Sequence, residues 1–150
     1  MQPDDPTYEQ RTRDSFARQN AMQTLGATIE MVAPGRVAIA MAHRDSLTQQ
    51  HGFIHAGMLA AALDSACGYA AFSLMPADAA VLTIEFKINL LAPARGPRFR
   101  FEGVVVKPGR TITVVEGRAL QFEADGSAEK LIATMSATVM TVLGREALKH

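Results

Sequence analysis

The sequence predicts an α+β domain in which a curved antiparallel sheet of five to six strands wraps around one long central helix. One segment, residues 56–75, is apolar over a length suited to a helix. Two strand-like runs precede this segment and four follow it, and most are joined by turns of hairpin length, which imply antiparallel pairing. Because that helix is the one element apolar enough to cover such a sheet, we expect it at the centre of the fold.

Length and composition limit the class of protein. The chain has 150 residues, 48% of them hydrophobic and 20% charged, so we expect one globular domain over residues 1–150. Its 15 basic and 15 acidic residues balance, which argues against nucleic-acid binding but permits a small anionic ligand. The single cysteine, Cys67, cannot form an internal disulfide, and residues 1–6 are acidic and contain proline, unlike a secretory signal. These features predict a cytosolic protein.

The apolar segment is also long enough to be considered as a membrane span. Its twenty residues carry a single charge, Asp64, near the middle, where a charge in a bilayer is costly. No basic cluster flanks either end. A buried central helix is therefore the better interpretation.

Before this helix, residues 7–25 are polar with scattered apolar positions and are followed by Gly26, which predicts an N-terminal helical arm over residues 1–25. After it, strict alternation over residues 81–91 predicts a strand with two distinct faces. One face would carry Leu82, Ile84, Phe86, Ile88 and Leu90, and the other Thr83, Glu85, Lys87 and Asn89. The remaining strands are predicted at residues 27–33, 37–41, 98–106, 111–122 and 131–142.

Several common catalytic motifs are absent. The chain has no G-x-S-x-G, no P-loop and no G-x-G-x-x-G after a strand. His51 and His55 are four residues apart and could share a metal, but a glycine lies between them and no H-E-x-x-H acid is present. Cys67 lies in the apolar helix without a neighbouring cation, as an inert core thiol does. We expect neither a metal nor a separate cofactor.

Asp64 is the candidate for catalysis. Its neighbours in sequence are almost all alanine, leucine and cysteine, so an unpaired carboxylate there would be expensive to bury. One interpretation is a structural cap or ion pair inside the fold. The other is a general base or nucleophile whose reactivity is set by a dry environment, and the position of the acid favours this second interpretation.

The start of the predicted helix offers groups that could polarise a carbonyl. Ala56 and Gly57 would supply unpaired backbone N–H groups at the positive end of the helix dipole, although Gly57 could simply serve a turn. His55 and Asp64 are nine residues apart, which puts them on opposite helix faces and roughly 13 Å apart along the axis. A site that combines the helix start with Asp64 must therefore take one of the two from a second subunit.

These residues resemble a known motif. The segment Gln49-Gln50-His51-Gly52-Phe53-Ile54-His55-Ala56-Gly57-Met58, with Leu63-Asp64 after it, is similar to the N-x-x-G-x-x-H-G-G motif of hotdog-fold acyl-CoA thioesterases of the phenylacetate-degradation (PaaI-like) type, in which an aspartate follows the histidine by nine residues. Residues 81–89, with Pro93 after them, resemble the next strand of that family, and the order of elements agrees over about residues 26–142. Gln49 replaces the family's asparagine, and Ala56 replaces the first glycine after the histidine.

The resemblance implies a role for each matching residue. Asp64 would activate water or attack the thioester carbonyl, and Thr83 would hydrogen-bond beside it. The Ala56 and Gly57 amides of the partner subunit would polarise the carbonyl. His55 would orient the loop or assist near the sulfur, and Gln49 would place the water or the substrate. The basic turn of Lys107, Gly109 and Arg110 would hold the phosphates of coenzyme A unless it is an ordinary solvated hairpin, and Arg95 is a weaker candidate for that role.

The sequence thus predicts an acyl-CoA thioesterase acting on an aryl or medium-chain acyl-CoA, assembled as a homodimer or a dimer of dimers. Coenzyme A would be part of the substrate. A non-catalytic acyl-CoA binder or sensor is the alternative from another class of function. A hotdog dehydratase ranks last, because it would require a histidine paired with a strong acid in a different motif.

Overall fold

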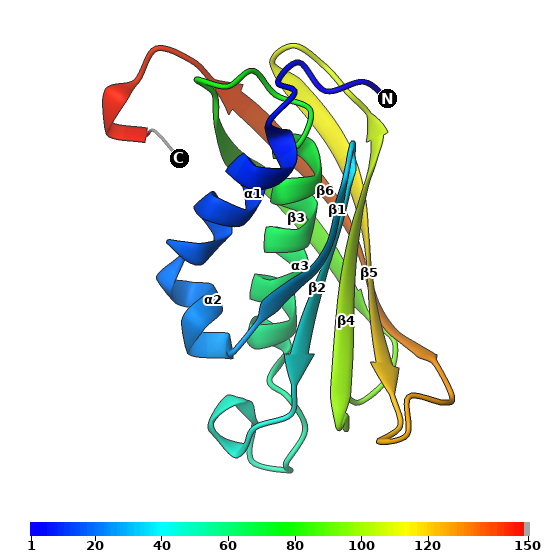
Figure 1. The fold of residues 1–150 in the computed structure, drawn as a ribbon. Helices are drawn as coiled ribbons and strands as arrows, with labels where there is room; N and C mark the ends of the chain where they lie inside the picture. Colours follow the sequence, from blue (N-terminus) through cyan, green and yellow to red (C-terminus); the bar gives the residue numbers. More distant parts are fainter. Residues whose placement is uncertain (149–150) are drawn as a thin grey trace.

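The computed structural model describes residues 1–148 and contains one six-stranded antiparallel sheet around a long helix (Figure 1). The sheet order is β1-β2-β4-β5-β6-β3, and every neighbouring pair is antiparallel. In chain order the elements are α1 (Tyr8–Ala17), α2 (Asn20–Leu25), β1 (Thr28–Ala33), β2 (Arg36–Ala42), the 3-10 turn η1 (Asp45–Leu47), α3 (Ala56–Phe72), β3 (Ala80–Leu90), β4 (Arg98–Lys107), β5 (Ile112–Phe122), β6 (Lys130–Val142) and η2 (Glu146–Leu148).

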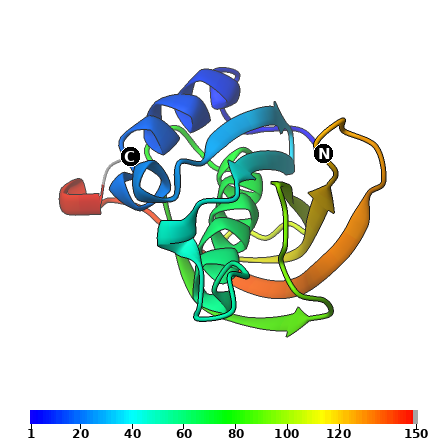
Figure 2. The same ribbon diagram turned by 90° about the horizontal axis from the view of Figure 1, so that it is seen from below.

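Helix α3 lies inside the curve of the sheet, as the view along its axis shows (Figure 2). Its middle and end are almost entirely buried, which explains why small apolar residues fill the segment. The strands approach it closely at two glycines, because a Cβ on Gly103 would lie 2.3 Å from the Ala66 carbonyl oxygen and one on Gly117 would lie 2.8 Å from Cys67 Sγ. The predicted central helix and antiparallel sheet are confirmed, and the architecture is the hotdog fold. No helix within residues 1–148 combines the length and the apolar character needed to span a bilayer.

Strand β3 departs from the predicted alternation. Thr83 pairs with Val139 and Glu85 pairs with Thr138, so these two residues of β3 are separated by one residue while their partners are adjacent. Ile84 is the extra residue of this β-bulge. The prediction that Thr83 and Glu85 share a face is therefore wrong, because the bulge turns Thr83 toward α3 and leaves Glu85 on the outer face, where Thr138 Oγ1 donates a 2.6 Å hydrogen bond to its carboxylate.

The N-terminal arm forms two short helices, α1 and α2, which meet at Arg18 and Gln19 and lie along α3 (Figure 1). Arg11 fixes the arm to the end of α3: its guanidinium donates hydrogen bonds of 2.7–3.2 Å to the carbonyl oxygens of Phe72, Met75 and Pro76. The Asp5 carboxylate pairs with the same guanidinium at 2.8 Å. Since α3 has no basic residue in its own last turn, Arg11 supplies the positive charge that stabilises a helix C-terminus.

Candidate active site

Asp64 lies in the middle of α3 and contacts β3. Thr83 Oγ1 donates a 2.8 Å hydrogen bond to Asp64 Oδ1. Burial raises the pKa of the Asp64 carboxyl, and the hydrogen bond from Thr83 partly opposes that rise. Within residues 1–148 we find no hydrogen bond to Asp64 Oδ2, which leaves this oxygen able to accept a proton or attack an electrophile.

The Asp64 carboxyl opens into a cavity of about 260 Å³, which we call the acid cavity. Polar groups line part of it, contributed by Gln19 of the arm, by Ser65 and Tyr69 of α3, and by Thr83. Val81 and Leu82 add apolar surface, and Gly68 leaves a gap in its wall. The cavity therefore combines a carboxylate with room for an organic group.

The start of α3 forms a second group of predicted residues. His55 is the N-cap, and its Nδ1 accepts a 2.8 Å hydrogen bond from the Gly57 N–H. The Gly57 amide is therefore already engaged within the chain. No partner for the Ala56 N–H is found within residues 1–148, so Ala56 carries the amide that can reach a ligand. Gln49 Oε1 accepts a hydrogen bond from the His51 N–H and stabilises the preceding loop.

A second cavity, of about 410 Å³, lies beside this helix start, and we call it the helix-start cavity. Gln49 and Ala56 line it together with Leu59, with Leu90 at the end of β3, and with Leu91 just after it. Phe53 also lines it, and the Arg95 guanidinium lies 4.6 Å from the centroid of the Phe53 ring. Arg95 thus lies near the helix-start cavity, where an anionic ligand group could meet it.

The two groups of predicted residues are separated within one chain. Asp64 comes eight positions after Ala56 in α3, which corresponds to about 12 Å along the helix axis. The acid cavity and the helix-start cavity share no lining residue. Within one chain, Asp64 and the Ala56 amide therefore lie in two separate cavities.

The predicted phosphate-binding turn lies at the opposite end of α3 from Ala56. Gly109 and Arg110 line a surface cavity of about 410 Å³ with Ala71 of α3 and with Leu74, which follows that helix. Lys107 is exposed at the end of β4. The Gly109 N–H donates a 3.3 Å hydrogen bond to Thr113 Oγ1, and a Cβ on Gly109 would collide with the Ile112 carbonyl oxygen. The glycine is therefore required by the turn itself.

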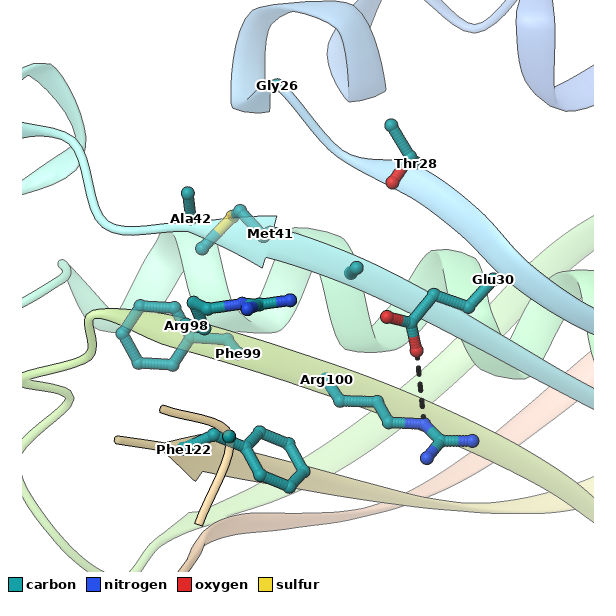
Figure 3. Close-up of a pocket in the computed structure, with 11 residues that line it drawn as sticks. Gly26, Thr28, Glu30, Met41, Ala42, Arg98, Phe99, Arg100 and Phe122 are labelled. Atoms are coloured by element: carbon teal, nitrogen blue, oxygen red, sulfur yellow. Dashed lines mark ion pairs between the residues drawn. The ribbon is translucent and has the colours of Figure 1, made fainter. Parts of the chain in front are cut away.

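A further groove, of about 390 Å³, lies on the outer face of the sheet, away from α3 (Figure 3). Its polar lining includes Arg98 and Arg100 of β4 and Glu30 of β1. Arg100 Nε lies 3.3 Å from the Glu30 carboxylate and 3.3 Å from that of Glu102, so the Arg100 charge is largely balanced. No residue predicted from the sequence to form the site lines this groove.

The remaining candidate groups do not form a reactive centre. Burial, with a smaller contribution from the Asp64 charge, raises the pKa of the Cys67 thiol to about 12, so the thiol is an unreactive core group. Within residues 1–148 no three His, Cys, Asp or Glu side chains gather as a metal site would require. His51 and His55 are both exposed, and His55 uses its Nδ1 as a helix cap.

Sequence reasoning missed part of the acid cavity. Gln19 reaches it from the N-terminal arm, and no local pattern links an arm residue to Asp64. Gly68 could have been found, because it lies four residues after Asp64 on the same face of the helix.

Comparison with known proteins agrees with this geometry. The solved structure of a thioesterase family protein from Silicibacter pomeroyi is 59% identical, with a TM-score of 0.88, and the match covers 91% of this chain and 99% of that one. The chain belongs to the thioesterase superfamily. The description of that superfamily matches residues 51–124, which include the helix start, Asp64 and Thr83.

This thioesterase-superfamily chain also resembles more distant proteins, one in fold and one in sequence. The E. coli PaaI protein, from the phenylacetic acid degradation operon, is 18% identical with a TM-score of 0.81, covering 92% of this chain and 95% of that one. A relative from Saccharolobus solfataricus whose name describes an esterase is 36% identical over 93 residues. That match covers 61% of this chain, which spans 64% of the length of the relative.

Proposed function

We propose that the protein hydrolyses acyl-CoA thioesters at two equivalent sites, each formed by the acid cavity of one subunit and the helix-start cavity of another. The observation that carries the proposal is Asp64: a partly buried carboxylate with one oxygen held by Thr83, the other free, and a cavity beside it. Membership of the thioesterase superfamily supports a thioester as the substrate.

The position of β3 supports a two-subunit site. β3 is the last strand of the sheet, and its side chains Leu82, Ile84, Phe86 and Leu90 are 41–52% exposed. An exposed apolar edge strand of eleven residues is a template for pairing with another chain. A symmetric interface would join β3 to β3 of a second copy in antiparallel orientation.

Such pairing would bring the acid cavity of one subunit and the helix-start cavity of the other together. The acid cavity contacts the start of β3 at Val81–Thr83, and the helix-start cavity contacts its end at Leu90. If the pairing is centred near residues 86 and 87, Thr83 of one subunit lies beside Leu90 of the other. Asp64 would then share a site with the Ala56 N–H of the second subunit.

In this arrangement Asp64 and the Ala56 N–H can hydrolyse a thioester by two routes. In the first route Asp64 Oδ2 takes a proton from water as the water oxygen bonds to the thioester carbonyl carbon. The oxyanion that forms accepts a hydrogen bond from the Ala56 N–H at the positive end of α3. When the carbonyl re-forms, the C–S bond breaks, the acid is released, and the thiolate of coenzyme A takes up the proton that Asp64 had taken from water. In the second route Asp64 attacks the carbonyl carbon directly, the C–S bond breaks, and the thiolate of coenzyme A leaves. Water then hydrolyses the mixed anhydride to the free acid and the Asp64 carboxylate, and the proton that water gives up goes to the thiolate.

The remaining assignments complete the proposal. Gln49 would hold the loop before α3 or place the substrate, and His55 would orient the same turn. Lys107, Gly109 and Arg110, or Arg95, would bind phosphates of coenzyme A. No separate cofactor takes part, and the protein would act in the cytosol as a dimer or a dimer of dimers on an aryl or medium-chain substrate.

The first test measures thiol release from a panel of aromatic and aliphatic acyl-CoAs with the wild-type protein and with Asp64→Asn. We expect hydrolysis by the wild type and a loss of at least about 100-fold in kcat for the variant, the size typical of a lost general base. If no substrate in the panel is hydrolysed while acyl-CoAs still raise the melting temperature, the protein is a binding module and the proposal is wrong.

A mixing experiment tests the two-subunit site. Ala56→Pro removes the proposed donor N–H at the first helical position, where proline is well tolerated, and the extended His55 backbone suits a following proline. Ala56→Gly is the matched control, because it keeps the N–H. We expect Ala56→Pro and Asp64→Asn each to be nearly inactive alone. Mixed dimers formed at random should recover about a quarter of wild-type activity, because half are heterodimers with one intact site each. If each variant is inactive alone and verified heterodimers also show no activity, the Ala56 N–H and Asp64 must act in a site within a single chain, and the two-subunit site is wrong.

The two routes can be distinguished by the carbon atom that receives the oxygen of water. Single-turnover hydrolysis in ¹⁸O-labelled water transfers the label to the free acid in the first route. In the second route water attacking the mixed anhydride at its aspartyl carbonyl would leave label on Asp64, which mass spectrometry of the peptide containing Asp64 would detect.

A further inference from the structure

Gly68 is an interior helix residue that packing within the chain does not explain. It lies in α3 four residues after Asp64, on the same face, and it is buried. Glycine in a helix interior is less favourable than alanine, so a glycine there needs a reason. The glycines of β4 and β5 have one, since a Cβ on Gly103 or Gly117 would collide with α3. A Cβ on Gly68 would meet no atom within 4 Å outside its own helix and its chain neighbours.

The empty space beside Gly68 is the acid cavity. Gly68 lines it together with Asp64, Tyr69 and Thr83. The missing side chain therefore leaves room next to the carboxylate that is proposed to act on the thioester. At about 260 Å³ the cavity is larger than the volume of about 150 Å³ that holds a benzene ring in an engineered protein core.

The N-terminal arm forms the opposite wall of this cavity. Ser65 Oγ donates a 3.3 Å hydrogen bond to Gln19 Oε1, which holds the junction of α1 and α2 over α3. Tyr69 is fixed from the same arm, because its hydroxyl lies 3.2 Å from Ser15 Oγ and its ring packs 5.8 Å from the Phe16 ring centroid. The wall opposite Gly68 is thus held by side-chain contacts.

We infer that Gly68 and Gln19 determine the size of the acyl group that the protein accepts: Gly68 leaves space beside Asp64 for a group with the bulk of a six-membered ring, and Gln19 closes the far side. The inference rests on the proposed thioesterase function. It assigns both residues a role in specificity, and neither takes part in the chemical step.

The test compares acetyl-CoA, hexanoyl-CoA and phenylacetyl-CoA as substrates of the wild type, Gly68→Ala, Gly68→Val and Gln19→Ala. We expect Gly68→Val to lower kcat/KM for phenylacetyl-CoA by at least about tenfold, since misfits of this size in a pocket cost about 10–200-fold. Acetyl-CoA, which does not need the space, should change by less than about twofold. Gln19→Ala should shift the preference toward larger acyl groups.

The melting temperature provides a second readout, because it distinguishes a glycine that borders empty space from a glycine that is required by close packing. Gly68→Ala should raise the melting temperature by about 2–4 °C, because alanine is the better helix former and its methyl group enters empty space. Gly117→Ala is the matched control: its Cβ would collide with Cys67 Sγ, so the melting temperature should fall while the substrate preference stays unchanged.

Three results would overturn the inference. An unchanged order of substrates in Gly68→Val, with wild-type hydrolysis intact, would reject the role of Gly68 and leave the proposed function standing. A change in oligomeric state in Gly68→Val would show that the space is filled by a second chain. If the wild type hydrolyses none of the three substrates and none raises its melting temperature, the proposed function fails together with the inference.

Discussion

The hydrogen bond from Thr83 to Asp64, 2.8 Å long, joins the first half of β3 to the middle of α3. It exists because of the bulge at Ile84, which places Thr83 on the face of the sheet that meets the helix. A regular strand in register with residues 85–90 would have presented an apolar side chain there. The bulge thus sets both the hydrogen bonding and the ionisation of the candidate base.

Removing this hydrogen bond should change the pH dependence of catalysis. Burial raises the pKa of Asp64 and Thr83 lowers it, so Thr83→Val should raise that pKa further. The acid limb of kcat/KM against pH should then move to higher pH, because the base must be ionised to act. Thr83→Ser keeps a hydroxyl and serves as the control. If the acid limb stays at the same pH in Thr83→Val, the ionisation of Asp64 does not control kcat/KM.

Neutralising Asp64 should stabilise the protein while it removes activity. Since the pKa of Asp64 is raised by burial above its ordinary value of 3.8, ionisation favours the unfolded state. The stability that a protonated Asp64 provides is present below pH 3.8 and is lost as the pH rises through the folded-state value. The melting temperature of Asp64→Asn should therefore exceed that of the wild type at pH 7, and the difference should shrink in acid. A lower melting temperature at pH 7 would indicate a structural role for the charge.

Loss of Arg11 should destabilise the fold substantially. Its guanidinium is bonded to three carbonyls at the end of α3, pairs with Asp5, and lies 4.2 Å from the Phe72 ring centroid. We expect Arg11→Ala to reduce the free energy of unfolding in urea by about 2–3 kcal/mol, because charged hydrogen bonds are lost and carbonyls are left unpaired. Arg13→Ala is the control, since Arg13 forms an exposed pair with Glu9 worth about 0.3–0.5 kcal/mol. Equal effects of the two substitutions would contradict this account.

The thiol of Cys67 should be unreactive in the folded protein. Its pKa is raised to about 12, so very little of the reactive thiolate is present, and its side chain is buried, so a reagent cannot reach the sulfur. Labelling with a thiol reagent at pH 8 should be negligible for the native protein and complete in denaturant. Rapid labelling without denaturant would mean that the packing between α3 and β5 opens easily.

The sequence allowed the fold to be predicted because its strongest signals are regular. The apolar run of α3, the alternating strands and the hairpin turns each follow from periodicity, and their order left one arrangement in which the helix covers the sheet. Asp64 could be identified because a charge in an apolar helix is costly. Two details could not be derived from periodicity: a single inserted residue at Ile84 changes the face of Thr83, and the break at Arg18 divides the arm into two helices.

The helix start shows a further limit of sequence reasoning. Two amides, those of Ala56 and Gly57, were expected to be available, but the rotamer of His55 engages one of them. The rotamer of an exposed side chain depends on the local backbone conformation, which periodicity does not report. The contribution of Gln19 to the acid cavity was missed for a similar reason, because Gln19 and its hydrogen-bond partner Ser65 are 46 residues apart in the sequence.

The close approach of Gly103 and Gly117 to α3 has a consequence for how this protein tolerates change. At Gly103 the distance between helix and sheet is set by main chain against main chain, since Ala66 contributes its carbonyl group there. We therefore expect exchanges of core side chains elsewhere to leave that distance unchanged. Substitutions that accumulate in the hydrophobic core should therefore lower the free energy of unfolding before they change the position of Asp64 relative to Thr83. Relatives with different core residues should then keep the same catalytic geometry.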